Sequence, residues 1–293
     1  MLPSTHWLFR LHCASRCSRG WIAWHRSARW HKFGACIGRE FSYELLAAVS
    51  PLTAEKLDDV LGQLTKTGLV FRRGTPPEAL YIFKHALVQD AAYDSLLKSK
   101  RAQLHTQIAQ LLERSSPERV ASEPELLAQH FTQAGLTERA VPYWIQAGQH
   151  ALQRVALAEA VGHLTTALSV NERTPASTER ERRELDIRLQ LATAHVASRG
   201  WAAVQLIQTL APARDLANRL GEDDKLVPIL NLTATYHEQR CEYSSTLAIV
   251  EELDALARSR EDSSTFVLAR WNETHSQCSR HSGSQTCSSS LRL

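Results

Sequence analysis

Residues 53–83 read TAEKLDDVLGQLTKTGLVFRRGTPPEALYIF, and the hydrophobic period changes within this stretch. Apolar residues first recur at the i, i+3, i+4, i+7 spacing of one helix face, at Leu57, Val60, Leu61 and Leu64. Thr53 precedes them as a cap candidate and Gly68 follows them. Two β-prone runs, 69–73 and 80–83, then flank a spacer rich in Gly and Pro. The stretch therefore predicts a short amphipathic helix followed by a β-hairpin.

Helical stretches are predicted on both sides of this segment, from Phe41 to Val49 and from His85 to Lys98. The resulting order is helix, helix, hairpin, helix over about 60 residues. This order is typical of a winged helix. A winged helix that reads DNA needs basic residues on the helix that enters the groove. Here that helix carries a net charge of −1 from Glu55, Lys56, Asp58, Asp59 and Lys66.

The chain after residue 100 shows two apolar helical stripes. The first consists of Leu104, Ile108, Leu111 and Leu112, and the second of Leu126, Leu127, His130 and Phe131. Residues 122–125, Ser-Glu-Pro-Glu, have the spacing of a capping box with proline in the first turn. We expect the two helices to pair as a hairpin.

The next stretch matches the 34-residue tetratricopeptide pattern of small and large residues at Trp144, Gly148, Ala151, Ala160, Leu164 and Ala167. Gly148 and Ala160 would let two antiparallel helices approach closely. Trp144 and Leu164 would fill the space between that pair and its neighbour.

Two further helix pairs are predicted, at 184–198 with 203–220 and at 225–239 with 244–258. Gly221 predicts a helix end, and Pro142 and Pro212 predict kinks or restarts. The fold class expected is therefore mainly α, with a winged-helix module and its small β-hairpin followed by a tetratricopeptide-like α-solenoid of antiparallel helix pairs.

Composition and charge divide the chain further. Residues 1–39 hold seven Arg or Lys and no acid, whereas residues 40–271 hold 25 basic and 30 acidic residues. We expect an irregular, basic, Trp- and Cys-rich segment that is foreign to the domain over 1–32, the winged-helix module over 33–99, helical repeats over 100–271 and a disordered Ser-rich tail over 272–293. The middle of the chain has no cationic surplus, which disfavours nucleic acid as a partner.

Several classes of chemistry have no motif here. The 293 residues contain no Walker A loop, no G-x-S-x-G elbow, no H-E-x-x-H helix and no G-x-G-x-x-G turn. No run of about 18 apolar residues predicts a membrane span. The Cys and His clusters near each end (His12, Cys13, Cys17, His25, His31 and Cys36; His275, Cys278, His281 and Cys287) lack paired zinc spacing. We expect no metal, no enzyme activity and, because Cys241 alone lies between the clusters, a reducing cytoplasmic location.

Four segments carry a family resemblance: IGREFSYELL from Ile37 to Leu46, YIFKHALVQDAAY from Tyr81 to Tyr93, PELLAQHF from Pro124 to Phe131, and YWIQAG from Tyr143 to Gly148. They resemble the region that follows the ATPase core in bacterial class III adenylate/guanylate cyclases with an AAA-type, STAND-like ATPase and tetratricopeptide repeats. The resemblance runs from about Phe33 to Trp271. It implies a regulatory fragment without the cyclase and P-loop domains, so no cofactor is expected in this chain and ATP or ADP belongs only to the missing ATPase.

The resemblance also implies one site residue. In related ATPases a histidine at the start of the last winged-helix helix senses bound ADP, and His85 stands at that place. With no P-loop, a histidine that caps or packs the helix is the alternative. The expected role is a scaffold that binds protein or peptide through its repeats, an ATPase or cyclase domain being one candidate partner. The alternatives are a sensor subunit acting in trans in a nucleotide cyclase system, and a winged-helix DNA-binding transcription regulator.

Overall fold

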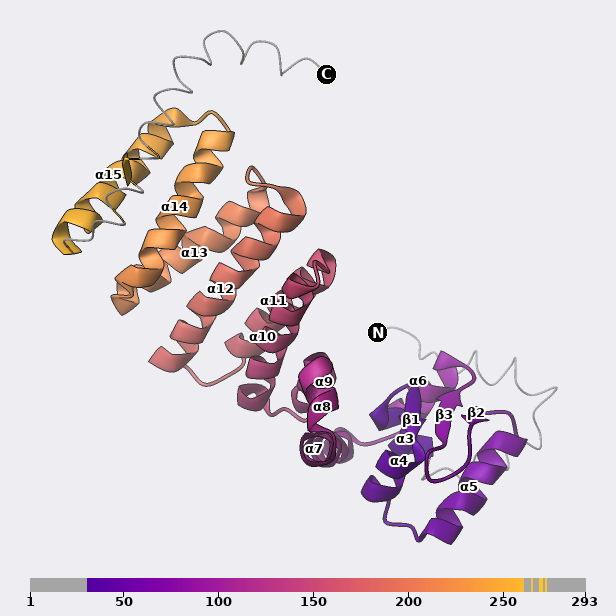
Figure 1. Ribbon diagram of the computed structural model, residues 1–293. Helices are drawn as coiled ribbons and strands as arrows, with labels where there is room; N and C mark the ends of the chain where they lie inside the picture. The colour runs from indigo at the N-terminus through magenta and orange to yellow at the C-terminus, as the bar shows by residue number, and fades with distance from the viewer. Residues whose placement is uncertain (1–30, 261–264, 266–268, 271, 273–293) are drawn as a thin grey trace, which may run out of the picture. The chain divides into compact units, whose positions relative to one another are not determined.

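The computed structural model describes residues 31–260, 265, 269, 270 and 272. These residues are mainly helical, with one small three-stranded antiparallel sheet, as the sequence predicts (Figure 1). They divide into two compact units between Leu136 and Thr137. The boundary predicted from the sequence lies after residue 99. In the structure, the helices between 100 and 136 belong to the first unit rather than to the unit that holds the later repeats.

The first unit begins with the elements of a winged helix in order. These are α3 (His31–Ile37), β1 (Glu40–Ser42), α4 (Tyr43–Val49), α5 (Ala54–Lys66), β2 (Val70–Arg73), β3 (Leu80–Phe83) and α6 (Ala86–Asp94). The strand order is β1-β3-β2, and both pairings are antiparallel. The predicted helix over 53–68 and the predicted hairpin are therefore confirmed. Thr53 is the N-cap residue of α5, although its side chain makes no capping hydrogen bond.

Two expectations for this region were wrong. The predicted helix over 41–49 starts two residues late, because Phe41 lies in β1 opposite Tyr81 and its ring stacks on the Tyr81 ring at 5.7 Å. Residues 31 and 32, expected to be irregular, belong to α3. Gly34 lets α3 pack closely against Phe41, since a Cβ atom at position 34 would lie 2.9 Å from the Phe41 ring. The rest of the irregular segment, residues 1–30, lies outside the described residues, as does the predicted tail apart from Asn272.

Three helices complete the first unit: α7 (Lys98–Ser115), α8 (Pro117–Ser122) and α9 (Pro124–Gln133). The predicted pairing of the two apolar stripes is confirmed, because α7 packs along α9. Leu104, Ile108, Leu127 and Phe131 are all fully buried. The predicted capping box is wrong, since Glu123 is the N-cap of α9 and the Ser122 hydroxyl donates to the Arg119 carbonyl instead. The proline expected in the first turn of α9 is Pro124.

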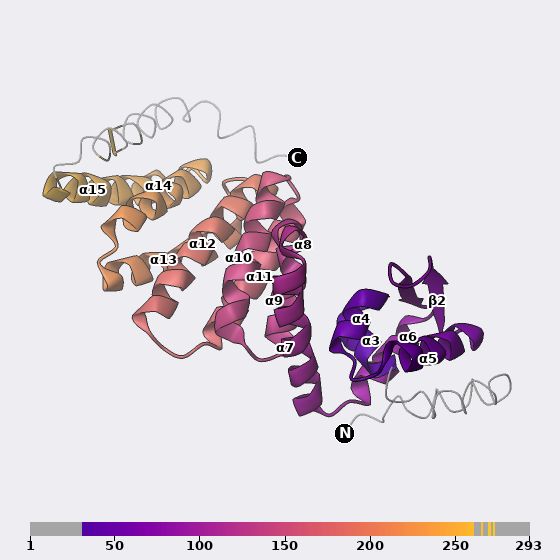
Figure 2. The same cartoon turned by 60° about the horizontal axis from the view of Figure 1, so that its bottom comes forward.

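The second unit is a row of helices, each packed on the next (Figures 1 and 2). They are α10 (Thr137–Gln153), α11 (Leu157–Glu172), α12 (Thr178–Arg199), α13 (Val204–Leu220), α14 (Asp223–Gln239) and α15 (Tyr243–Arg260). The predicted helix pairs are confirmed, with α12 starting earlier than expected. Pro142 and Pro212 lie inside α10 and α13, which continue through them, so neither proline restarts a helix. Gly221 ends α13 in the left-handed conformation, as predicted.

Small residues bring α10 and α11 together. A Cβ atom on Gly148 would lie 2.6 Å from Cγ of Leu164, so only glycine permits this approach. Ala160 and Leu164 are fully buried, and Trp144 is 6% exposed with its ring 5.5 Å from the ring of His163. Leu164 lies in one core cluster with Leu191 and Ala194 of α12, as predicted, whereas the Trp144 ring lies against α11 of its own pair. A second, larger core cluster consists mainly of Leu, Ile and Ala side chains from α12 to α15.

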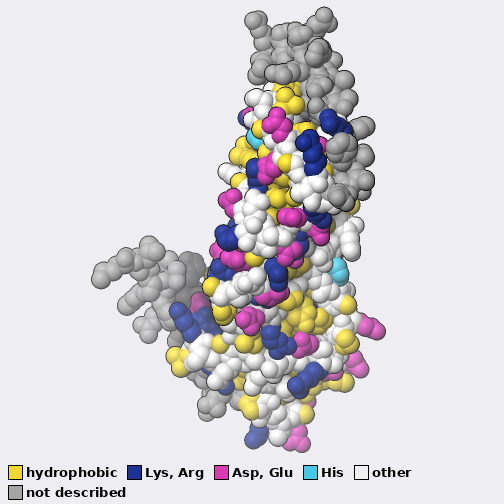
Figure 3. Space-filling model, turned by 90° about the vertical axis from the view of Figure 1, so that its left-hand side faces the viewer, with side chains coloured by type: hydrophobic (Ala, Val, Ile, Leu, Met, Phe, Trp, Pro, Cys, Tyr) yellow, Lys and Arg dark blue, Asp and Glu magenta, His cyan; other side chains and the backbone are white. Residues whose placement is uncertain are grey.

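Ion pairs link the helices of the second unit across their exposed edges: Arg219–Glu181, Arg182–Glu222, Lys225–Asp186, Arg214–Glu252 and Arg260–Asp224. On the face shown in Figure 3, described acidic and basic side chains are interspersed. Such a surface carries no extended field of one sign. None of the described helices has the length and apolar character to cross a membrane.

Candidate functional site

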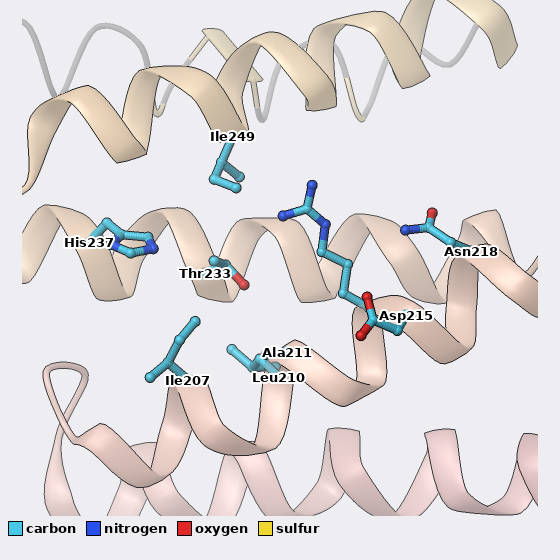
Figure 4. A pocket seen from close by; sticks show the side chains of 9 residues that line it. Ile207, Leu210, Ala211, Asp215, Asn218, Thr233, His237 and Ile249 are labelled. Atoms are coloured by element: carbon cyan, nitrogen blue, oxygen red, sulfur yellow. The ribbon is translucent and has the colours of Figure 1, made fainter.

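A groove lies on the second unit between α13, α14 and α15, with a volume of about 390 Å³. Helix α13 contributes one of its faces through Ile207, Leu210, Ala211, Arg214, Asp215 and Asn218, and Thr233 and His237 come from α14. Ile249 reaches it from α15 (Figure 4). Gly221 makes this arrangement possible, because the helix end there lets α14 turn back along α13.

The groove has an apolar part and a polar part. Ile207, Ala211 and Ile249 supply aliphatic surface, whereas Arg214, Asp215 and Asn218 lie further along α13 (Figure 4). The Thr233 hydroxyl donates to the Ile229 carbonyl at 2.7 Å and so keeps only acceptor capacity towards the groove. A site of this composition can hold an aliphatic side chain beside polar or charged groups. It contains no arrangement of nucleophile, base and orienting group.

Two ion pairs lie in or beside the groove, one at Arg214 in its lining and one at Glu242 next to His237. Arg214 binds Glu252 of α15, which joins the first and third helices of the site. His237 Nδ1 lies 2.7 Å from one oxygen of Glu242, and Arg240 Nε lies 2.7 Å from the other. The Arg240 hydrogen bond, followed by that of His237, lowers the pKa of Glu242. Glu242 therefore stays ionised and neutralises Arg240.

His85, the site residue implied by the family resemblance, is the N-cap residue of α6. Its side chain makes no capping hydrogen bond and is exposed. His85 thus caps the helix through its backbone carbonyl, which accepts from Val88 N at 3.0 Å, while its imidazole is accessible at the surface of the first unit.

A buried polar cluster in the first unit was missed by sequence reasoning, which treated the helical histidines one by one. Nδ1 of His105 on α7 lies 2.9 Å from Nδ1 of His130 on α9. Nε2 of His105 lies 3.1 Å from the Tyr93 hydroxyl, which donates to Gln133 Oε1 at 3.3 Å. Burial, followed by the charge of Arg101, lowers the pKa of His105 to about 4. Burial, followed by His105, lowers the pKa of His130 to about 3. Both rings are therefore neutral near pH 7, and the cluster joins α6, α7 and α9 structurally.

No group of His, Cys, Asp or Glu suited to a metal ion occurs among the described residues. Most of the two terminal Cys and His clusters lies outside them. His31 and Cys36, both in α3, are the exceptions, and the Cys36 thiol forms no disulfide within the described part of the chain and is buried, which raises its pKa to about 12. A thiol of this kind is neither a ready nucleophile nor a ready metal ligand.

The groove residues could not be found from the sequence alone. Ile207, Ala211, Asp215 and Asn218 lie on one face of α13 at helical spacing, but their mixed chemistry resembles any solvated helix face. Only the register of three helices brings them opposite Thr233 and Ile249.

Comparisons with known proteins give one relative. The chain is 31% identical over 137 residues to an uncharacterized protein of Rhizobium meliloti (strain 1021). The match covers 46% of this chain and 13% of that protein, which is therefore several times longer. No protein-family model matches the chain, and no solved structure matches it.

Proposed function

We propose that this chain is the regulatory, non-catalytic part of a signalling protein that combines a STAND-type AAA ATPase with a class III nucleotide cyclase. In that role it binds segments of partner proteins through its tetratricopeptide-like repeats. The observation that carries the proposal is the groove between α13, α14 and α15, in which aliphatic and polar side chains converge without a catalytic arrangement. Stacked helix pairs commonly use such surfaces to bind peptides or domains.

Two further observations support this role. The first unit has the element order of a winged helix, as the family resemblance implies for the region after the ATPase. The matched relative is several times longer than the chain, which fits a region of a large multidomain protein. The Cys36 thiol, which forms no disulfide within the described part of the chain, fits the cytoplasm as the location.

The binding role can be tested with random peptides displayed on phage and selected on the full chain. Peptides that bind the groove should lose at least about tenfold in affinity when Ala211→Trp fills it. Gln208→Trp is the matched control, because Gln208 is exposed on the same helix but does not line the groove. Failure to select any peptide, or equal binding to both variants, would contradict the proposal.

A second candidate function is a sensor subunit that acts in trans on an ATPase domain. The His85 side chain is exposed and makes no capping hydrogen bond in α6, so its imidazole is accessible to a partner. This accessibility favours the sensor function. Its test is ATP hydrolysis by an added ATPase domain of the family. The chain should change that rate, His85→Ala should abolish the change, and Asp90→Asn on the exposed side of α6 should not.

Binding to DNA is not part of the proposal. The exposed charges of α5 sum to −1, and the cations at the hairpin are confined to Arg72, Arg73 and Lys84. Arg72 contacts the Tyr81 hydroxyl and Lys84 lies over the Phe71 ring, so two of these three cations interact within the module.

A further inference from the structure

We infer that the groove selects extended peptide segments in which Lys or Arg is next to an aliphatic residue, and that the Arg214–Glu252 ion pair sets this choice of charge. The inference rests on the proposed function, because it assumes that the groove is the peptide site. It adds the chemistry of the ligand and the residues that determine it.

The aliphatic half of the preference comes from the apolar part of the groove. Ile207 is partly exposed on α13, and Ile249 extends from α15 towards α14 (Figure 4). Ala211 has only a methyl group beside them and leaves the room that the groove occupies. A branched aliphatic side chain inserted here would remove from water the apolar surface that Ile207 and Ala211 expose on α13.

The preference for a cationic residue follows from which charged side chains in and beside the groove already have an ion-pair partner. Arg214 is paired with Glu252, and Arg240 and His237 are both bonded to Glu242. Asp215 is exposed in the groove lining and forms no ion pair within the described part of the chain. The lining therefore presents one uncompensated carboxylate, which attracts a cation and repels an anion.

Asn218 lies one helical turn after Asp215 on the same face of α13. Its amide offers a donor and an acceptor, a combination that suits the backbone of an extended segment. An extended chain could therefore place its cation at Asp215, its backbone at Asn218 and a neighbouring aliphatic side chain between Ile207 and Ile249.

The ion pair allows the preference to be removed by mutation. Glu252 approaches Arg214 from the opposite wall, so removing its charge leaves the guanidinium in the groove without its partner. Arginine then provides a forked donor site for a carboxylate. Glu252→Gln should thus leave Arg214 to offset the charge of Asp215 and should abolish the preference for cations while keeping the size of the side chain.

The experiment measures fluorescence polarisation of two labelled heptapeptides on the full chain, one with alternating Leu and Lys and one with Glu in place of every Lys. At low ionic strength the Lys peptide should bind at least about fivefold more tightly, and about 1 M salt should remove the difference. Asp215→Asn should equalise the two affinities. Glu252→Gln should also equalise them, because Arg214 then offsets Asp215.

Glu251→Gln is the matched control, because it removes the same charge from the adjacent, exposed position of α15 outside the groove. It should change each affinity less than about twofold. Binding of both peptides with equal affinity, a preference for the Glu peptide, or an equal effect of Glu251→Gln and Glu252→Gln would overturn the inference and leave the proposed function standing. If neither peptide binds and Ala211→Trp changes nothing, the proposed function fails as well.

Discussion

The contact between His105 and His130 shows how one pair of side chains can make a chain sensitive to pH. Burial disfavours the imidazolium form, so the two rings share a hydrogen bond as neutral groups. Tyr93 extends the bonding to Gln133, and the Arg101 guanidinium lies 4.8 Å from the centre of the Tyr93 ring. An added proton on either histidine would be buried near this cation.

The first prediction concerns the pH dependence of unfolding. Between about pH 4 and pH 6.5 the unfolded chain binds more protons than the folded chain, because the folded pKa values of both histidines lie below 6.5. Stability should therefore be highest above pH 6.5 and fall as the pH drops, by about 1.4 kcal/mol per histidine per pH unit at most. Urea unfolding at pH 7 and pH 5 measures this loss.

His130→Leu should reduce that loss, while the part due to His105 and to His195, whose pKa burial also lowers, should remain. His150→Leu, at a half-buried position on α10, should leave the loss unchanged. An identical pH dependence in wild type and His130→Leu would show that the pair does not control the acid response.

The second prediction concerns Trp144. Its ring is buried between α10 and α11, so Trp144→Ala should lower the free energy of unfolding by about 3–5 kcal/mol. Trp201→Ala removes the same side chain at a site that is 41% exposed and should cost much less. Equal losses in chemical denaturation would place Trp144 outside the core.

At the scale of elements, the spacing between α10 and α11 depends on the absence of one methyl group. Gly148 faces Leu164 closely, whereas Gly162 on α11 has no atom within 4 Å of the position of its Cβ. Two glycines on neighbouring helices therefore have opposite reasons to be present. One permits contact, and the other only weakens its helix.

The third prediction uses this contrast. Gly148→Ala should destabilise the chain by about 1–3 kcal/mol, because Leu164 must move. Gly162→Ala should stabilise it by about 0.5–1 kcal/mol through helix propensity. Thermal or urea unfolding of both variants gives the signs, and a loss of stability in both would contradict the assignment of roles.

The fourth prediction concerns the loop between α10 and α11. Val155 has φ of 59° and is exposed, a conformation that costs a β-branched residue about 1–2 kcal/mol. Val155→Gly should therefore stabilise the chain by up to about 1 kcal/mol. Ala158→Gly, at an exposed position within α11, should destabilise it by about as much. Destabilisation by Val155→Gly would mean that the side chain makes a favourable contact.

The elements differ in how far the sequence could predict them. Helix α5 and the hairpin were predicted because their periodicity is local, with Leu57, Leu61 and Leu64 all buried on one face. Strand β1 has three residues, too few for an alternation to be recognised, and it exists only because β3 provides a partner. The groove and the pairing of His105 with His130 depend in the same way on the register between helices, which a single sequence does not contain.

At the scale of the whole molecule, the described residues form two units with separate cores. The second unit contains the core clusters that run from α10 to α15, and the first contains Phe41, Tyr81 and Phe83 under its sheet. A unit with its own buried core can fold alone.

The fifth prediction follows from this division. Residues 31–136 and 137–272, produced separately, should each unfold cooperatively, and their summed circular dichroism should equal that of residues 31–272. A fragment 137–272 without helical signal would show that the repeats require the first unit. The predicted boundary after residue 99 would then need a new test with a fragment that begins at residue 100.

The ion pairs across the second unit give it a further property. All five join residues 36 to 40 positions apart in the chain; Arg219–Glu181 and Arg260–Asp224 join adjacent helices, and the other three join a helix to the next but one. These ion pairs therefore connect each helix to helices that lie one or two places along the row, as in a repeat protein whose units contact their near neighbours. Opening can start at α15 and stop before α12. Amide hydrogen exchange should accordingly be fastest in α15 and slow progressively towards α12, and a ligand seated in the groove, which α15 helps to form, would slow the exchange of α15 most.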